Sequence, residues 1–391
     1  MTRFAETIRV AATKNVSDIH IMSDKPVVFR QNGMIVFQRE LWRQQDVKEL
    51  ADKLMSARDR NVLKDRLSVD FARTVSHVRI RINVFHAASG LGMAIRLLPG
   101  RVPRIRDLNL HPSIEECSRL TSGLVLICGT ASCGKSTTVA AIIEEINAKR
   151  SAHIVTLEDP IEYAFTSKKS LIAQRELGTH MPSFEQGLLD VLREDPDVIV
   201  VGEIREPETI RLTLIAAESG HLVIASLHAS SAEDALHRMC NAFHPETQDS
   251  VRNQIASTLS FLMVQRLVLM PRRHYRVPLL SILKGTQSVK SMIRDNRLMQ
   301  IENAILTGRD EGMFSMEQYR AYMENRNDLV PPMSILSPSV AEPDPSGQPS
   351  QEAPPGLLPE VDESASETIL EIDEKASLSE LIAEADKLLR G

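Results

Sequence analysis

Short alternating runs of apolar and polar residues dominate the first part of the chain. Residues 17–21 and 26–30 alternate with a period of two, which predicts strands. A turn signal at 31–33 leads into the apolar residues 34–37, which predicts a hairpin. Before them, the apolar positions at 3–14 have helical spacing and predict one short amphipathic helix.

This pattern continues as far as residue 98. Residues 44–66 are polar with regularly spaced apolar positions and predict a helix, whereas 69–74, 78–86 and 93–98 predict three more strands. Runs of strands with few helices are typical of α+β domains, so we expect residues 1–98 to form one.

The pattern changes after a break that contains proline and glycine. Short apolar runs now alternate with helices, which predicts a parallel sheet covered on both faces. The predicted strands are 124–127, 153–157, 198–201 and 222–225. Residues 247–327 are expected to be mostly helical. We therefore predict a linker at 99–112 and an α/β domain at 113–330.

The last part of the chain, residues 331–391, has the composition of a linker. It holds 13 acidic and 3 basic side chains and nine of the 20 prolines, and such segments do not build a core. At 377–389 a capping box and one apolar face predict a short amphipathic helix. We predict a disordered acidic tail whose terminal helix either docks on its own chain or binds a groove of another protein.

Composition and charge limit the class of protein. Of 391 residues, 42% are hydrophobic and 25% charged, as is usual for soluble globular proteins. No apolar run approaches the roughly 18 residues of a transmembrane helix, and four cysteines lack metal-ligand spacing, so we expect a reduced, cytoplasmic protein without a transmembrane segment. Without the tail the net charge is +4, which is too weak to indicate a nucleic-acid partner.

One segment carries a specific chemical signal. Residues 129–136 fit the phosphate-loop pattern G-x-x-x-x-G-K-[ST] without a gap, between the strand at 124–127 and a helical pattern at 138–149. Backbone N–H groups at such a helix start bind phosphate, Lys135 would reach the β- and γ-phosphates, and Ser136 would bind Mg²⁺. We therefore predict that ATP and Mg²⁺ bind here. The predicted binding residues are Gly129, Thr130, Ala131, Ser132, Cys133, Gly134, Lys135, Ser136 and Thr137.

An ATPase also needs acidic side chains that organise Mg²⁺ and polarise the attacking water. Glu158 and Asp159 follow the strand at 153–157, and Glu203 follows the strand at 198–201. Ligands bind at the carboxyl ends of strands in open α/β sheets, so these acids are expected near the phosphate loop. A solvated acid at a strand end is the alternative interpretation of each one taken alone.

Four segments in this order resemble the motifs of secretion ATPases. Residues 129–137 are similar to the phosphate loop of that superfamily, 157–162 to its Asp box, 192–197 to its Walker B motif and 220–228 to its His box. The superfamily, also called the GspE/PilT family, drives type II and type IV secretion and type IV pili. The nearest likeness is to the pilus ATPases PilT and PilU, and it extends over residues 18–313.

The resemblance implies an architecture and an assembly. A PAS-like N-terminal domain would precede a RecA-like ATPase domain with C-terminal helices, and ATP would be held between the subunits of a homohexamer. Arg81 and Arg96 match the phosphate-sensing arginines of the family, a role that suits the permanent charge of the guanidinium. ATP would pull them towards phosphate and rotate the domains. The ring would work in the cytoplasm, peripheral to the inner membrane, against a platform protein of a pilus or secretion machine.

The resemblance also assigns roles to single residues of the ATPase domain. Glu203 matches the catalytic base that positions water, and Glu158 matches an acid that acts through Mg²⁺ or the water. His228 matches the histidine of the γ-phosphate region, with His221 nearby. For His228 taken alone, an ordinary polar residue at a strand end is the alternative.

The chain departs from the family pattern at several positions. Thr130, Ser132 and Cys133 replace proline, glycine and serine in the loop, and a positive φ at Ser132 would strain it by about 1 kcal/mol. Ser89 replaces a third arginine. Residues 288–295 are a diverged copy of a motif that matters for retraction, so assembly and retraction both remain open.

Cys133 has two interpretations. A thiol beside a helix N-terminus and Lys135 should ionise readily, which predicts that alkylation blocks ATPase activity and that bound nucleotide protects. Alternatively, Cys133 is a small residue that merely fits the loop.

The predicted function is ATP hydrolysis that powers a type IV pilus machine, as in PilT-like twitching motors. Within the superfamily the alternatives are ATPases of type IV secretion, conjugation or type II secretion. A nucleic-acid translocase is a further alternative, opposed by the weak charge and by an aromatic content of 4%. The last alternative is a binding module, a ring subunit that holds ATP as a structural switch and hydrolyses it poorly, and the presence of both Glu203 and Lys135 opposes it.

Overall fold

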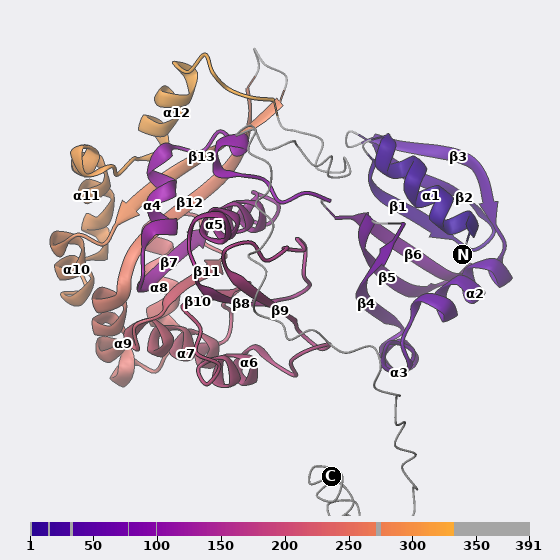
Figure 1. Ribbon diagram of the computed structural model, residues 1–391, viewed down its shortest axis with the longest axis horizontal. Helices are drawn as coiled ribbons and strands as arrows, with labels where there is room; N and C mark the ends of the chain where they lie inside the picture. The colour runs from indigo at the N-terminus through magenta and orange to yellow at the C-terminus, as the bar shows by residue number, and fades with distance from the viewer. Residues whose placement is uncertain are drawn as a thin grey trace, which may run out of the picture. The chain divides into compact units, whose positions relative to one another are not determined.

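The chain folds around two β-sheets with helices packed against them, which confirms the predicted α/β class (Figure 1). The computed structural model describes six stretches of chain: residues 2–14, 16–31, 34–76, 78–98, 100–270 and 275–331. The predicted tail, with its terminal helix at 377–389, lies outside the described residues except for Pro331.

The first sheet has six strands in the order β3-β2-β1-β6-β5-β4, and all neighbours are antiparallel. All six overlap the strands predicted from the sequence. They are β1 (Val16–Met22), β2 (Lys25–Gln31), β3 (Met34–Trp42), β4 (Ser68–Val75), β5 (Val78–Ala87) and β6 (Gly90–Leu97).

Three helices accompany this sheet: α1 (Thr2–Thr13), α2 (Gln44–Leu54) and α3 (Ala57–Arg66). The sequence predicted a single helix at 44–66, but the structure has two helices there, because Met55 and Ser56 interrupt the helix. The reason is local. The Ser56 hydroxyl accepts a hydrogen bond from the backbone N–H of Asp59 at 3.2 Å, so it caps a new helix.

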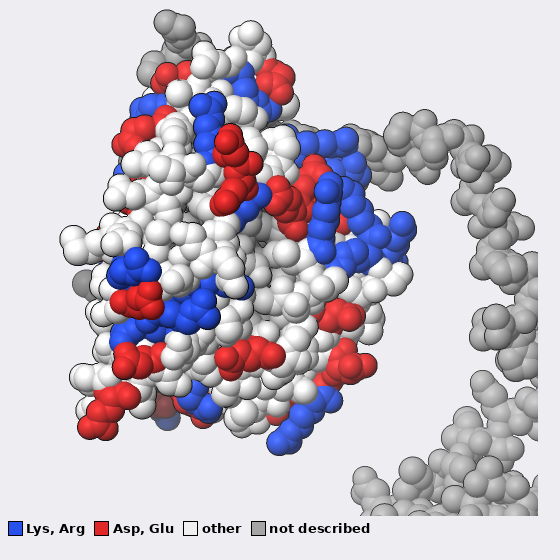
Figure 2. All heavy atoms as spheres, turned by 90° about the vertical axis from the view of Figure 1, so that its left-hand side faces the viewer, with Lys and Arg blue, Asp and Glu red and all other residues white. Residues whose placement is uncertain are grey.

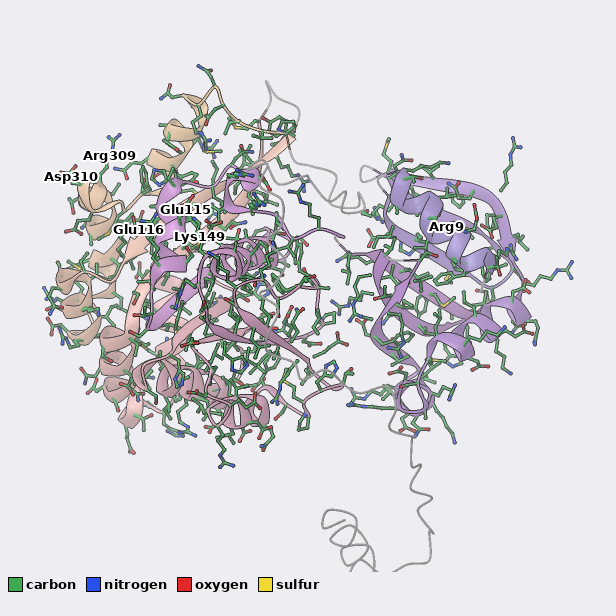
Figure 3. The ribbon with its side chains drawn as sticks, in the orientation of Figure 1. Arg9, Glu115, Glu116, Lys149, Arg309 and Asp310 are labelled. Atoms are coloured by element: carbon green, nitrogen blue, oxygen red, sulfur yellow. The ribbon has the colours of Figure 1, made fainter. Side chains whose placement is uncertain are left out.

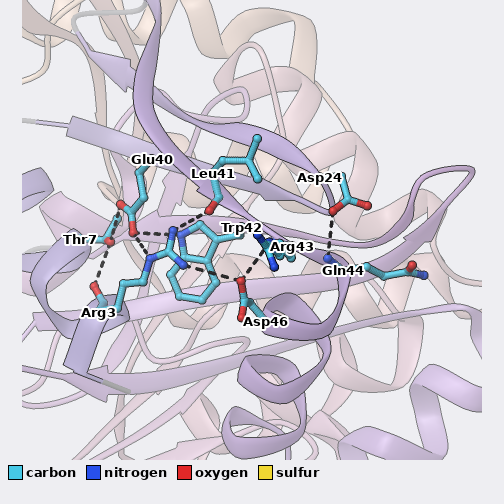
Figure 4. Close-up of polar contacts among 9 residues, drawn as sticks. All are labelled: Arg3, Thr7, Asp24, Glu40, Leu41, Trp42, Arg43, Gln44 and Asp46. Carbon is cyan, nitrogen blue, oxygen red and sulfur yellow. Dashed lines mark hydrogen bonds and ion pairs between the residues drawn. The ribbon is translucent and has the colours of Figure 1, made fainter.

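Helix α1 is fastened to strand β3 by polar contacts (Figure 4). Arg3 donates through Nε to Glu40 Oε1 and through Nη2 to the carbonyl oxygen of Leu41, both at 2.6 Å. The Arg3 guanidinium also lies over the Trp42 ring, 4.4 Å from its centroid, and Thr7 donates to Glu40 at 3.2 Å. These contacts hold the apolar face of α1 in the core of the first sheet.

The second sheet has seven strands in the order β13-β12-β7-β11-β10-β8-β9. All neighbours are parallel except β12 and β13. The strands are β7 (Gly123–Cys128), β8 (His153–Glu158), β9 (Leu171–Glu176), β10 (Val198–Val201), β11 (Leu222–Leu227), β12 (Leu259–Met270) and β13 (Tyr275–Lys284). The four predicted strands are β7, β8, β10 and β11.

Both faces of this sheet are covered, as predicted. Leu124 and Leu126 of β7 belong to one hydrophobic core, whereas Val125 and Ile127, which point to the opposite face, belong to another. The helices that supply these cores and their flanks are α4 (Glu115–Arg119), α5 (Lys135–Lys149), α6 (Phe184–Val191), α7 (Pro207–Glu218), α8 (Ala232–Asn241), α9 (Pro245–Thr258), α10 (Gln287–Arg294), α11 (Ile301–Thr307) and α12 (Met316–Glu324). At the surface, Glu115 of α4 lies 3.7 Å from Lys149 at the end of α5 (Figure 3).

The prediction that residues 247–327 are mostly helical missed two strands, because β12 and β13 occupy the middle of this segment between helices α9 and α10. The run 259–270 is apolar almost throughout. A run that is buried on both faces has no period of two, so it cannot be told from a buried helix by pattern alone. The structure assigns the first seven residues of β12 to the interior of the sheet, with six of them buried.

The predicted domain boundaries at 98 and 112, and the PAS-like character of the first sheet, stay predictions. Ile105 and Leu110, inside the predicted linker, are buried in a core of the second sheet. None of the helices in the described stretches is long and apolar enough to cross a membrane. On the face drawn in Figure 2, basic and acidic side chains lie interspersed.

Candidate active site

A cavity of about 580 Å³ lies at the carboxyl edge of the seven-stranded sheet. Its walls include the loops that follow β7, β8, β10 and β11, which are the positions where parallel sheets bind ligands. It brings together most of the residues that the sequence singled out: Arg81, Ala131, Ser132, Lys135, Ser136, Glu158, Asp159, Glu203 and His228.

The phosphate loop connects β7 to α5, and two of its residues have backbone conformations that favour glycine. The φ angle is +147° at Gly129 and +92° at Gly134, directly before α5 begins. Ser132 has a φ of +59°, so it occupies the left-handed conformation considered above. Lys135 Nζ donates to the carbonyl oxygens of Gly129 at 2.9 Å and Thr130 at 3.1 Å, so its ammonium lies over the loop.

The structure favours the simpler interpretation of Cys133. Its side chain is buried, with 4% of the residue exposed. A Cβ on Gly129 would lie 2.5 Å from the Cys133 sulfur, so the two residues are in close contact. A reagent would reach this thiol only after the loop opens, and the alkylation hypothesis stays a prediction.

Glu203 lies just beyond β10 and has two partners. Its Oε1 is 3.1 Å from Nε2 of His228, and its Oε2 accepts a hydrogen bond from Nη2 of Arg205 at 2.7 Å. Burial alone would raise the pKa of Glu203, but the hydrogen bond from Arg205 and the electrostatic influence of His228, Arg205 and Lys135 together lower it. The carboxylate is therefore ionised at neutral pH, as a general base must be.

Glu158, at the end of β8, is shifted in the opposite direction. Burial raises the pKa of Glu158, although its Oε1 accepts hydrogen bonds from Thr156 at 2.6 Å and Gln174 at 2.9 Å. Burial also raises the pKa of Asp159, against the charge of Arg81. One cavity therefore contains Glu203, whose pKa is lowered, and Glu158 and Asp159, whose pKa values are raised. This difference distinguishes Glu203, which can act as a base, from the other two carboxyl groups.

The two predicted arginines differ in their positions. Arg81 of β5 lines the cavity and binds both oxygens of Asp70, with its shortest contact at 2.6 Å. Arg96 lies directly opposite on β6, but it pairs with Asp18 at 2.9 Å and does not line the cavity.

Two further sequence positions lie away from the cavity. His221 precedes β11 and His228 follows it, so the strand separates them and His221 is not near the site. Its Nδ1 instead lies 2.9 Å from the carbonyl oxygen of Ala216. Ser89 lies in the turn between β5 and β6.

Sequence reasoning missed the residues that support the site. Gln174 donates to Glu158 and to the carbonyl oxygen of Tyr163, at 2.9 and 2.8 Å, and so links the start of the Asp box to the residue that follows it. Tyr163 donates to Thr137 of the phosphate loop at 3.0 Å, and burial raises the pKa of this phenol to about 12. Gln174 lies on β9, a strand that the pattern did not predict. Arg205 could have been found, because it follows Glu203 by two positions.

This arrangement can bind an anion and remove a proton beside it. The N-terminus of α5 and Lys135 present positive charge to one wall, and an ionised carboxylate stands at another. No group of three or more His, Cys, Asp or Glu side chains in the described part of the chain could hold a metal ion by itself. A cation here would need ligands from the bound anion.

Comparison with known proteins agrees with this chemistry. A family model described as "Type II/IV secretion system protein" matches residues 2–321. The chain is 38% identical over 314 residues to "Uncharacterized protein YggR" of Escherichia coli, covering 80% of this chain and 95% of that protein. It is 34% identical over 314 residues to "Type IV pilus retractation ATPase PilT" of Pseudomonas aeruginosa, covering 80% and 91%.

A solved structure is also similar. The crystal structure of "the Pilus Retraction Motor PilT and Bound ADP" has 36% sequence identity and a TM-score of 0.76, covering 88% of this chain and 97% of that one.

Proposed function

The chain belongs to the type II/IV secretion system protein family, and on that basis we propose that it is a motor ATPase that hydrolyses ATP to drive a type IV pilus machine. Similarity to PilT over most of both chains supports this proposal, and the solved PilT structure holds ADP.

The observation that carries the proposal is the convergence of Lys135, Glu203 and His228 on one cavity at the carboxyl edge of the sheet. Lys135 and the backbone N–H groups at the start of α5 would bind the phosphates. The Glu203 carboxylate, kept ionised by its lowered pKa, would accept the proton of the attacking water. General-base catalysis of this kind contributes on the order of 10²–10⁴-fold in rate.

The residues present also fit Mg²⁺. Ser136 and the carboxylates of Glu158, Asp159 and Glu162 line the cavity and offer the oxygen ligands that Mg²⁺ prefers. Mg²⁺ bound together with ATP would neutralise charge on the phosphates. We propose Ser136 and Glu158 as the residues that hold it. Because Thr156 and Gln174 fix the Glu158 carboxylate, that group is already oriented.

We further propose that the chain assembles as a homohexamer in the cytoplasm and acts on an inner-membrane platform protein of the pilus machine. ATP would be held between subunits, and Arg81 of the N-terminal domain, which lines the cavity, would respond to its phosphates, whereas Arg96 lies outside the cavity and is given no such role. Family membership supports this part of the proposal. The mass of the purified protein with and without ATP, measured by light scattering, tests the ring directly, and a monomer under all nucleotide conditions would contradict it.

The function is tested by phosphate release from ATP in the presence of Mg²⁺. We expect turnover by the wild type, and in Glu203→Gln a kcat lower by roughly 10²–10⁴-fold with ADP binding retained. Glu208→Gln is the matched control, because Glu208 lies on α7 and pairs with Arg211 outside the cavity. Undiminished turnover in Glu203→Gln would contradict the proposal. Stimulation by DNA would favour a nucleic-acid translocase, and no turnover by the wild type would favour a non-enzymatic switch.

A further inference from the structure

A buried glutamine interrupts the apolar run of strand β12 in the second sheet. Gln265 lies on β12, one position after Val264, which pairs with Cys128 at the end of β7. It is therefore level with Gly129, the first residue of the phosphate loop. Only 2% of Gln265 is exposed. A buried amide side chain usually has hydrogen-bond partners for both its oxygen and its nitrogen.

Both ends of the Gln265 amide are bonded to the loop and its helix. Nε2 donates to the carbonyl oxygen of Cys133 at 2.7 Å, and Oε1 accepts from the hydroxyl of Thr138 at 2.7 Å. Thr138 lies in the first turn of α5 and is itself 1% exposed. One side chain on a neighbouring strand thus joins the last turn of the loop to the start of the helix.

The glycines of the loop are in contact with the same residue. A Cβ on Gly129 would lie 2.5 Å from the carbonyl oxygen of Gln265, and a Cβ on Gly134 would lie 2.8 Å from its Nε2. These distances leave no room for a side chain. The two glycines are therefore needed for close approach to Gln265 as well as for their positive φ.

The next residue of β12 holds a second loop of the site. Arg266 Nη2 donates to the carbonyl oxygen of Ser230 at 3.2 Å. Ser230 comes two positions after His228, the partner of Glu203. Adjacent residues of β12 therefore bond to the phosphate loop and to the loop that carries His228.

We propose that Gln265 is a positioning residue that holds the phosphate loop in its nucleotide-binding conformation. Ser132, a non-glycine residue with positive φ, has an intrinsically unfavourable backbone and keeps it only where the surroundings impose it. Gln265 supplies that constraint from a buried strand, so the backbone N–H groups are ordered before nucleotide arrives. Preorganisation of this kind increases affinity by reducing the cost of ordering on binding. The proposal rests on nucleotide binding at this loop, as proposed above.

The test is the affinity of the full-length protein for ADP, measured by calorimetry. Gln265→Met keeps the volume of the side chain and removes both hydrogen bonds, and we expect its Kd for ADP to rise by roughly tenfold. KM for ATP should rise in parallel while kcat at saturating ATP changes little, because Gln265 lines no part of the cavity. A loss of kcat with unchanged KM would overturn the positioning role.

Thr213→Val is the matched control. It also removes a buried hydrogen bond, from Thr213 to the carbonyl oxygen of Thr209 at 2.7 Å, but on α7 and outside the loop. We expect its ADP affinity to stay unchanged even if its melting temperature falls as far as that of Gln265→Met. An equal loss of affinity in both variants would mean that general destabilisation, not positioning, is responsible.

A second variant covers the case in which Gln265→Met fails to fold. Thr138→Val removes only one of the two bonds and should weaken ADP binding in the same direction by less. In the double variant the two effects should not add, because the residues act through one bond. Wild-type affinity in Thr138→Val and Gln265→Met would overturn the inference, whereas a wild type that binds no ADP would overturn the proposed function as well.

Discussion

Next to the phosphate loop, the polar side chains of Thr138 and Gln265 are buried and hydrogen-bonded to each other, whereas Arg81 and Arg96 on strands β5 and β6 are exposed and paired with acidic side chains. Thr138 and Gln265 are 1% and 2% exposed. By contrast, the side chains of Arg81 and Arg96 are 39% and 62% exposed in their pairs with Asp70 and Asp18. The first region is fixed from within the sheet, and the second is held by contacts that solvent can reach.

The difference is one of energy as well as position. Removing one partner of a buried hydrogen bond costs about 1–3 kcal/mol, whereas an exposed ion pair contributes about 0–1 kcal/mol. Arg81 can therefore exchange the carboxylate of Asp70 for another anion at little cost, whereas the loop cannot rearrange cheaply. We infer that the loop sets nucleotide affinity and that Arg81 responds to what the loop has bound.

The largest expected effect is on the loop side. In Lys135→Met we expect ADP to bind roughly 10- to 100-fold more weakly, because charge-assisted hydrogen bonds contribute about 1.5–3 kcal/mol. Calorimetry measures this. Lys149→Met is the control, since Lys149 lies at the other end of α5, beside Glu115 and outside the cavity (Figure 3). Similar affinities in the two variants would mean that the loop does not bind the phosphates.

The two arginines provide the next test. Arg81 lines the cavity and Arg96 does not. We expect Arg81→Ala to lower kcat by about tenfold, the equivalent of one charge-assisted hydrogen bond, and Arg96→Ala to lower it by less than about twofold. Steady-state kinetics of the two variants measure both values of kcat. Equal losses would show that both arginines reach the nucleotide, in an arrangement of the N-terminal strands that differs from this one.

A smaller effect concerns pH. The hydrogen bond from Arg205 helps to lower the pKa of Glu203, so this carboxylate remains ionised as the pH falls below the usual range for a glutamate. In Arg205→Gln the pKa should rise, and the base should be protonated at a higher pH. The acidic limb of the kcat/KM profile should therefore move to higher pH, with little change at neutral pH. Arg211→Gln, on the exposed surface of α7, should leave the profile in place.

The smallest effect is on stability. Ser132→Gly removes the steric strain of a side chain at a left-handed position, which should raise the free energy of unfolding by about 1 kcal/mol. The greater flexibility of glycine in the unfolded chain makes the net gain smaller. Thermal unfolding measures this. Ser132→Ala keeps the Cβ and should give no gain, so a gain of the same size in both variants would rule out backbone strain as its cause.

The same contrast explains what the sequence could predict. Features that depend on residues close together in the chain could be predicted from local patterns. These are the phosphate loop, the acids at the ends of β8 and β10 and the strands of the first sheet. Gln265 and Cys133 are 132 positions apart, and no local pattern relates them. Strands β12 and β13 were missed because burial on both faces removes the period that identifies a strand.

The positions of the arginines could not be predicted for a different reason. Arg81 and Arg96 are cross-strand neighbours, as the hairpin pattern allows, but only one of them lines the cavity. Which arginine lines the cavity depends on how β5 and β6 are placed against the edge of the second sheet. The spacing of residues along the chain does not predict this placement. Arg79 of β5 was not singled out either, although it pairs with Glu176 of β9 at 3.1 Å.

Amide hydrogen exchange with and without saturating ADP tests the central claim most directly. We predict that ADP slows exchange at residues 129–138 and in the loops at 158–163 and 202–205, and leaves β1, β2 and β3 unchanged. Unaltered exchange at 129–138 in the presence of ADP would contradict the account.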